Sequence, residues 1–440
     1  MKKFILLSFV ILQAQDLPSC KTGVLDKTFA GIGYANVGNG TLIAMGRQSD
    51  GTIIACGYTY TPSNYLLLVA YDSQGNIKTS FAGNGRVVAL FGEGDETNGF
   101  ALHILPDDSI LIAGYIIDGA AKKNFAVIKY TSTGQLDINF GNNGVAATNF
   151  GGGSNDVAYA LVVQSDGKIV LGGLSNDGVR DLFGLARFTK EGILDTTFGG
   201  GGTGYVQTAV RSLISETPRG DTIFGLELQS DQKIVAVGYS NESGNKFDSA
   251  LVRYTKDGVV DNTFGVNGAC IHQFASGKHD QLKDVKILSD DSIIAVGYGK
   301  NASSVDTGII VKYTKDGDLD TTFNETGYSF ATIVGNDQFW RCILQKDGKI
   351  LVAGLTYIGS SALFLVRYNS SGSLDTSFGD QGFIATKLTE DGDYISDVFV
   401  DNKKTYGVGS YGSGSGVIVC FFNHHDHIST LKNQESAGAL

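Results

Sequence analysis

The chain repeats one short phrase seven times, and this repeat constrains its fold more than any other feature. The clearest copy is Leu-Asp-Thr-Thr-Phe-Gly at residues 194–199. The phenylalanine of the phrase occurs at Phe29, Phe81, Phe140, Phe198, Phe264, Phe323 and Phe378, with a mean spacing of about 58 residues. Self-similarity at a nearly fixed period indicates one supersecondary unit repeated along the chain.

Two further landmarks divide each unit into strands. Gln-Ser-Asp-Gly-Lys-Ile at 164–169 places an Asp-Gly turn before a run of β-branched residues, and similar segments begin at Gln48, Gln229 and Gln345. Such a turn indicates a β-hairpin, because glycine accepts the positive φ that tight turns require. A later apolar run ends in a basic–aromatic pair. Examples of this pair are Lys129-Tyr130, Arg253-Tyr254 and Arg367-Tyr368. Each unit therefore contains four short strands and no segment with helical periodicity.

Seven units of four strands predict an all-β protein, a seven-bladed β-propeller of four-stranded blades. We take the run ending at Gln164 as an innermost strand, followed outward by 168–173, 183–188 and the strand after the Phe-Gly corner. In this phase the chain begins on an outermost strand and ends on the third strand of the last unit. The N-terminal strand is therefore expected to complete the last blade, which closes the ring and leaves no open sheet edge.

These motifs resemble the bacterial delta-60 repeat family, and the blade logic is similar to that of NHL-type propellers. The resemblance covers about residues 25–423 and rests on the Leu-Asp-Thr-Thr-Phe-Gly phrase, the Gln-Ser-Asp-Gly-Lys-Ile hairpin and the Arg-Tyr pair. The seventh copy departs most, with Asp401-Asn402-Lys403 at its hairpin and no phrase after its third strand. The resemblance implies an exported propeller whose role is poorly defined, and it supplies no catalytic residues.

Composition excludes several other classes of protein. The 440 residues include 60 glycines and only 4 prolines, 42% of them are hydrophobic, and the formal net charge is −11. Collagen requires abundant proline, and a disordered chain requires few apolar residues. An acidic chain also lacks the basic surface of a general nucleic-acid binder. The glycines fit a folded β protein with many tight turns.

The N-terminus indicates export. Lys2 and Lys3 precede about nine apolar residues, which is the pattern of a secretory signal peptide and too short for a membrane span. We expect a signal peptide over 1–19, cleaved after Ala14 or processed as a lipoprotein at Cys20, which would add a lipid anchor. The propeller would then cover 20–423 and a polar tail 424–440. No later stretch is apolar enough to span a bilayer, and the expected product is a monomer outside the cytoplasm: extracellular, periplasmic or at the cell surface.

Two groups of residues are candidates for a site in the central channel. Four acids begin the expected inner strands, Asp156, Asp221, Asp280 and Asp337, where the other units have Gly40, Thr97 and Gly392. They would gather at one channel mouth and bind a cation or a basic or hydroxylated ligand, or else only cap strand ends. Farther along the same strands, polar residues interrupt the apolar pattern and are expected to line the channel. These are His103, Glu227, Asp284, Lys286 and Arg341.

Other chemistry-bearing residues have simpler interpretations. The aspartates of the repeated phrase, such as Asp137 and Asp261, could be calcium ligands, but we expect each to accept backbone N–H groups or to pair with the basic residue of its own third strand. His424, His425 and His427 offer weak metal-binding chemistry at the expected start of the tail. Trp340, the only tryptophan, is expected in the core between blades.

The sequence thus predicts architecture far better than ligand. It contains no catalytic triad, phosphate loop or dinucleotide fingerprint in a suitable context. The favoured hypothesis is a non-enzymatic, exported binding or cell-surface interaction scaffold for a protein, a glycan or a small molecule, with no cofactor. The alternative is an enzyme at the channel mouth, a calcium-assisted hydrolase or lactonase built on the four acids.

Overall fold

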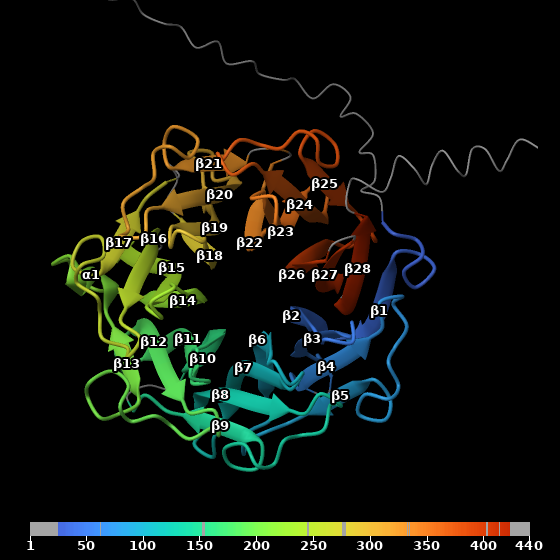
Figure 1. The fold of residues 1–440 in the computed structure, drawn as a ribbon, viewed down its shortest axis with the longest axis horizontal. Helices are drawn as coiled ribbons and strands as arrows, with labels where there is room; N and C mark the ends of the chain where they lie inside the picture. The colour runs from blue at the N-terminus through green and yellow to red at the C-terminus, as the bar shows by residue number, and fades with distance from the viewer. Residues whose placement is uncertain are drawn as a thin grey trace, which may run out of the picture.

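The computed structural model is a ring of seven antiparallel four-stranded sheets around a central axis (Figure 1). It describes residues 25–61, 63–151, 155–243, 246–274, 279–331, 333, 335–401, 404–412 and 414–422. The seven-bladed β-propeller is therefore confirmed. The expected signal peptide, Cys20 and the histidines of the tail lie outside the described residues.

Each blade contributes one strand to each of four concentric positions. The innermost strands are β2 (Thr41–Arg47), β6 (Thr97–Ile104), β10 (Val157–Val163), β14 (Asp221–Leu228), β18 (Gln281–Ile287), β22 (Gln338–Leu344) and β26 (Asp393–Val400). The second strands are β3 (Ile53–Tyr58), β7 (Ile110–Ile117), β11 (Ile169–Asn176), β15 (Ile234–Ser243), β19 (Ile293–Lys300), β23 (Ile350–Tyr357) and β27 (Lys404–Tyr411). The third strands are β4 (Leu66–Tyr71), β8 (Lys123–Tyr130), β12 (Asp181–Phe188), β16 (Lys246–Tyr254), β20 (Asp306–Tyr313), β24 (Ser361–Tyr368) and β28 (Ser415–Phe422). The outermost strands are β5 (Arg86–Ala89), β9 (Val145–Thr148), β13 (Tyr205–Thr208), β17 (Ala269–His272), β21 (Tyr328–Ala331), β25 (Phe383–Thr386) and β1 (Tyr34–Asn39).

Closure by the N-terminal strand is also confirmed. The last blade has the order β1-β28-β27-β26, so its outermost strand comes from the start of the chain. Tyr34 lies opposite Val419 in this antiparallel pair, and Lys404 contacts the Asp26 carboxylate at 2.5 Å. This joint keeps the two ends of the propeller in one hydrogen-bonded sheet.

One short helix interrupts the β structure within the described residues. It is α1 (Val210–Leu213), in the connection between β13 and β14. No helix among the described residues is long and apolar enough to cross a membrane.

The repeated phenylalanine packs each blade against the next one. All seven are buried, with 0–4% of their surface exposed. Phe198, for example, lies beneath Gly258 of the following blade, where a Cβ atom would stand only 2.5 Å from the ring. The Gly199 amide also donates to the carbonyl of Asp257 at 2.8 Å. Gly258 has a φ of +83°, so the turn requires glycine for both its conformation and this close approach.

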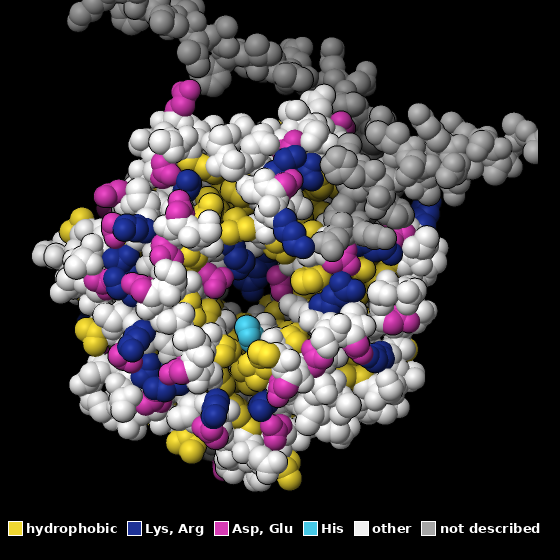
Figure 2. Space-filling model, viewed as in Figure 1, with side chains coloured by type: hydrophobic (Ala, Val, Ile, Leu, Met, Phe, Trp, Pro, Cys, Tyr) yellow, Lys and Arg dark blue, Asp and Glu magenta, His cyan; other side chains and the backbone are white. Residues whose placement is uncertain are grey.

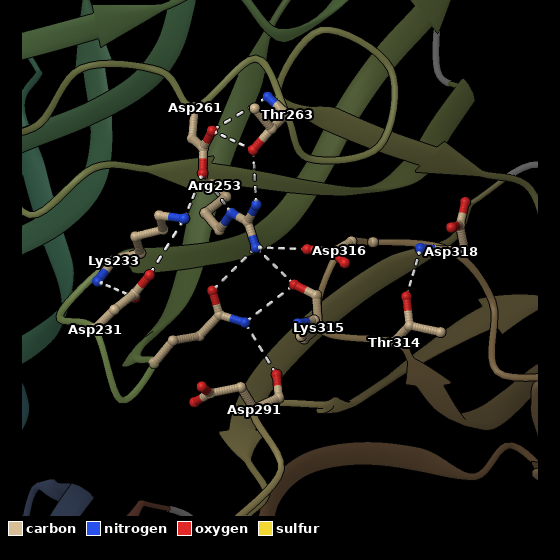
Figure 3. Close-up of polar contacts among 12 residues, drawn as sticks. Asp231, Lys233, Arg253, Asp261, Thr263, Asp291, Thr314, Lys315, Asp316 and Asp318 are labelled. Atoms are coloured by element: carbon tan, nitrogen blue, oxygen red, sulfur yellow. Dashed lines mark hydrogen bonds and ion pairs between the residues drawn. The ribbon is translucent and has the colours of Figure 1, made fainter.

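A buried arginine network reinforces the same boundary (Figure 3). Arg253 on β16 is 3% exposed and donates to Asp261 of its own blade at 2.9 Å. It also donates to the carbonyl of Lys315 in the next blade at 2.6 Å. Gln229, from the repeated hairpin, accepts from Arg253 and donates to the carbonyls of Asp291 and Lys315. The glutamine of the Gln-Ser-Asp motif is therefore a clamp between blades as well as part of a hairpin.

The repeated aspartates pair with the basic residue of their own third strand, as the sequence predicted. Ion pairs join Lys129–Asp137, Arg187–Asp195, Arg253–Asp261, Lys312–Asp320 and Arg367–Asp375, with closest N–O distances of 2.6–3.1 Å. Burial would raise the pKa of Asp261, but bonds from Thr263 and the charge of Arg253 lower it to about 2. Each of these carboxylates therefore pairs with a basic residue of its own blade.

Candidate functional site

Every inner strand carries a β-bulge at the same place, close to its start. The register with the second strand shifts by one residue in all seven blades. The residues at the bulge are Ile43, Phe100, Tyr159, Phe224, Lys283, Trp340 and Ser396. A bulge inserts an extra residue and turns its side chain away from the regular alternation. Here it presents one side chain from each blade to a single cavity.

That cavity forms one mouth of the central channel and has a volume of about 280 Å³. The seven bulge residues line it together with Tyr298, Arg341 and Tyr394. We call these ten residues the aromatic mouth. Because the bulges lie near the starts of the inner strands, this mouth is on the side of the loops that connect successive blades.

The rings of the aromatic mouth form a partly exposed apolar surface. Tyr159 lies between Phe100 and Phe224, with ring centroids 5.2 Å and 5.5 Å away. Trp340 contacts Tyr394 edge-to-face at 5.1 Å. All five are only partly buried. Tilted and edge-to-face pairs leave some ring faces free for a ligand.

Lys283 is the bulge residue with a cationic side chain. Its Nζ lies 3.4 Å from the centroid of Phe224 and 5.7 Å from that of Tyr298. It makes no hydrogen bond or ion pair with the residues that the structure describes. Burial, together with the charge of Arg341, lowers the pKa of Lys283 to about 7. An amine of this kind changes its charge near neutral pH.

Behind the aromatic mouth, the channel differs on its two sides. Blades one to four contribute small residues at this depth: Ala44, Ala101, Ala160 and Gly225. Blades five to seven contribute Asp284, Arg341 and Asp397 instead. The Arg341 guanidinium lies 3.9 Å from Asp284 and 3.6 Å from Asp397.

The two carboxylates beside Arg341 also join neighbouring blades. Asp284 accepts the amide of Cys342 at 2.9 Å, and Asp397 accepts that of Met45 at 2.8 Å. Burial raises the pKa of Asp397 although Arg341 opposes the change. Arg341 is therefore held by two acids that are themselves held by backbone amides.

The deepest layer lies nearer the opposite mouth and is charged. Lys286 contacts Glu227 at 3.6 Å and Asp284 at 3.3 Å. Burial would lower the pKa of Lys286, but these two carboxylates raise it, while burial raises the pKa of Glu227. Burial also lowers the pKa of His103, which favours the neutral ring. Figure 2 shows the central hollow with basic and acidic side chains around it.

The five residues expected along the channel are all found there. His103, Glu227, Asp284, Lys286 and Arg341 line one cavity of about 400 Å³, which we call the channel cavity. It meets the aromatic mouth at Tyr159, Phe224 and Arg341, which line both. A binding role for these residues stays a prediction.

The four acids expected at a channel mouth are placed differently. Asp156, Asp221, Asp280 and Asp337 are at most 1% exposed and do not line either cavity. Each accepts a backbone amide from the loop that enters its strand: Phe150, Val210, Phe274 and Ile333, respectively. Placing them at an open mouth was wrong, because a strand-start carboxylate satisfies the amides of the connecting loop before it reaches solvent.

The residue expected at the start of the last inner strand was also wrong. Asp393, and not Gly392, begins the last inner strand, and it accepts the amides of Leu388 and Thr389 at 2.5 and 3.0 Å.

Within the described residues, no three His, Cys, Asp or Glu side chains are grouped so that they could hold a metal ion. The calcium hypothesis therefore gains no support from these acids.

Trp340 is the second correction, since it lines the aromatic mouth and is not inter-blade core. Strict alternation of side chains along the strand places Trp340 on the wrong face of the sheet, because the bulge adds one residue. The sequence held a signal for two of the four aromatic bulge residues, which stand between small ones in Gly99-Phe100-Ala101 and Ala158-Tyr159-Ala160. Trp340 lacks this signal because it stands between Phe339 and Arg341. Aromatic residues between small ones at one position of a repeat indicate side chains that project from the sheet.

Comparison with a known family supports the propeller repeat. A model described as a domain of unknown function (DUF5122) beta-propeller matches residues 164–198, 229–264, 288–323 and 345–378. Each match runs from the first hairpin of a unit to its corner phenylalanine, and together they cover about a third of the chain. The narrower likeness to the delta-60 repeat stays a resemblance. No curated protein matches the chain significantly.

Solved structures resemble this chain only distantly. Semaphorin 2a from Drosophila is 10% identical with a TM-score of 0.48, over 88% of this chain and 74% of that one. The polysaccharide lyase Uly1 is 10% identical with a TM-score of 0.45, over 87% and 90%. A glucose dehydrogenase is 11% identical with a TM-score of 0.43, over 88% and 98%. Likenesses this distant say nothing of this chain's ligand.

Proposed function

We propose that this protein is an exported, non-enzymatic binding scaffold that holds a glycan at the aromatic mouth. The observation that carries the proposal is the convergence of one bulge residue from every blade on a single cavity. Small-molecule sites are typically concave and mostly apolar, with a few polar groups that fix orientation. The aromatic mouth has this composition.

A sugar ring matches these rings chemically. The rings of Phe100, Tyr159, Phe224 and Trp340 offer flat apolar faces to the C–H face of a sugar. Lys283, Arg341, Ser396 and the tyrosine hydroxyls offer polar groups to its hydroxyls. With about 280 Å³, the cavity is near the lower end of the usual range of roughly 300–1,000 Å³ for ligand pockets, so it fits a terminal sugar unit better than a long chain.

The repeated motifs favour a scaffold over an enzyme. Their phenylalanines, glutamines, arginines and aspartates hold blades together, and the four strand-start acids hold loops. The calcium-dependent alternative requires a cation to reach Asp221 and Asp280, which are both fully buried. A calcium titration of the purified propeller tests it: stoichiometric binding that disappears in both Asp221→Asn and Asp280→Asn would restore that alternative.

Calorimetric titration against a panel of neutral and acidic oligosaccharides tests the proposal. We expect saturable binding by the wild type and a loss of about tenfold in affinity in Tyr159→Ala, since an aromatic contact is worth about 0.5–1.5 kcal/mol beyond the area that it buries. Phe330→Ala is the matched control, because Phe330 is also partly exposed but lies on the outermost strand β21. If no member of the panel binds to the folded wild type, or if both variants lose affinity equally, the proposal is wrong.

A further inference from the structure

The two cationic side chains of the aromatic mouth, Arg341 and Lys283, differ in whether they form ion pairs. Arg341 lies between Asp284 and Asp397, which face it from β18 and β26. Both acids also accept backbone amides of the next blade. Arg341 is therefore compensated before any ligand arrives.

Lys283 has no such compensation. Its Nζ lies over the ring of Phe224 and has no carboxylate partner among the described residues. The other ionisable side chains of the aromatic mouth are the phenols of Tyr159, Tyr298 and Tyr394, together with Arg341. Burial raises the pKa of Tyr159 and of Tyr298 to about 12 and also raises that of Tyr394, so these phenols stay neutral at physiological pH. Among the described residues, the aromatic mouth thus holds a cation without an ion pair and no free anion.

We propose that the glycan held at the aromatic mouth is an acidic sugar whose carboxylate pairs with Lys283. The inference rests on the proposed function and specifies its ligand class. A carboxylate supplies the acceptor that Lys283 lacks, and the pair forms in a partly desolvated site where charge-assisted hydrogen bonds are strong. The sugar ring would lie against the neighbouring aromatic rings, with Phe224 beneath the lysine.

This pairing couples binding to the protonation of Lys283. The free amine has a pKa of about 7, so it loses its charge as the pH rises through neutrality. An anionic ligand stabilises the charged form, so above that pH the amine of Lys283 takes up a proton when the ligand binds. Affinity for an acidic sugar is therefore expected to fall from about pH 6 to about pH 8.5, whereas arginine at this position would stay charged throughout.

The experiment compares oligogalacturonates, oligoglucuronates and oligomannuronates with their methyl esters, which keep the ring and remove the charge. We expect at least one acid to bind the wild type about tenfold or more tightly than its ester, as for a hydrogen bond to a charged group. Lys283→Met should bring the acid to the affinity of its ester. Lys283→Arg should keep the preference and remove its pH dependence. Lys190→Met, at a lysine that is 71% exposed, is the control and should change nothing.

The outcomes separate this inference from the proposed function. If glycans bind but no acid is preferred over its ester, or if Lys283→Met keeps the preference, the inference is overturned and the binding scaffold stands. If neither the neutral nor the acidic members bind to the folded protein, the proposed function fails together with the inference.

Discussion

The boundaries between blades and the lining of the channel are built on opposite principles. At the boundaries the same residue types recur: a phenylalanine corner, a glutamine clamp and a basic residue paired with an aspartate. In the channel the equivalent positions differ from blade to blade, as the small residues of four blades and the charged residues of three show. In this chain, positions that repeat from blade to blade hold the structure together, whereas positions that differ line the candidate site.

The largest expected effect comes from breaking a boundary network. Arg253→Met removes the buried partner of Asp261 and Gln229 and leaves Asp261 only the more exposed Lys233 at 3.3 Å, so we expect a loss of about 3 kcal/mol in the free energy of unfolding. Lys312→Met removes the equivalent group of the next blade, whose side chain is 17% exposed, and should cost about 1 kcal/mol. Denaturant unfolding of both variants measures the difference. Equal losses would show that burial does not set the strength of these pairs.

A smaller effect is expected when the channel arginine is removed. Arg341→Met leaves Asp284 and Asp397 facing each other across a cavity that admits solvent, so we expect a loss of about 1–2 kcal/mol at neutral pH. The sign of the pH dependence follows from Asp397. Burial already raises the pKa of Asp397, and without Arg341 this pKa rises further, so the cost of keeping Asp397 charged is relieved as the pH falls. The stability deficit should therefore be smaller at about pH 5 than at about pH 8. A deficit that grows on acidification would contradict this arrangement.

The smallest loss of stability is expected at Lys283. Because burial lowers the pKa of this amine to about 7, its charge opposes folding at neutral pH, and Lys283→Met should not lower the free energy of unfolding. The same denaturant series measures it beside Arg253→Met. A loss of more than about 2 kcal/mol would mean that Lys283 holds the fold, and the contrast between boundary and channel would then fail at this position.

The sequence predicted the ring and its closure because a repeat of four short strands has few ways to bury its apolar faces. It also predicted His103, Glu227 and Arg341 in the channel, since polar residues on an inner strand interrupt a regular alternation. The bulge is a property of strand pairing, so the position of Trp340 was missed. Asp221 and Asp280 were misplaced for a related reason, because their partners are amides of loops whose paths depend on the folded backbone.

The fluorescence of Trp340 directly tests whether the ligand binds at the aromatic mouth. Trp340 is the only tryptophan of the chain and lines the aromatic mouth, so its emission reports on this cavity alone. We expect an acidic oligosaccharide to shift the emission to shorter wavelength and to protect the ring from a soluble quencher. This change should saturate with the affinity measured by calorimetry. Glycan binding that leaves the emission and quenching of Trp340 unchanged would place the ligand elsewhere and contradict the account.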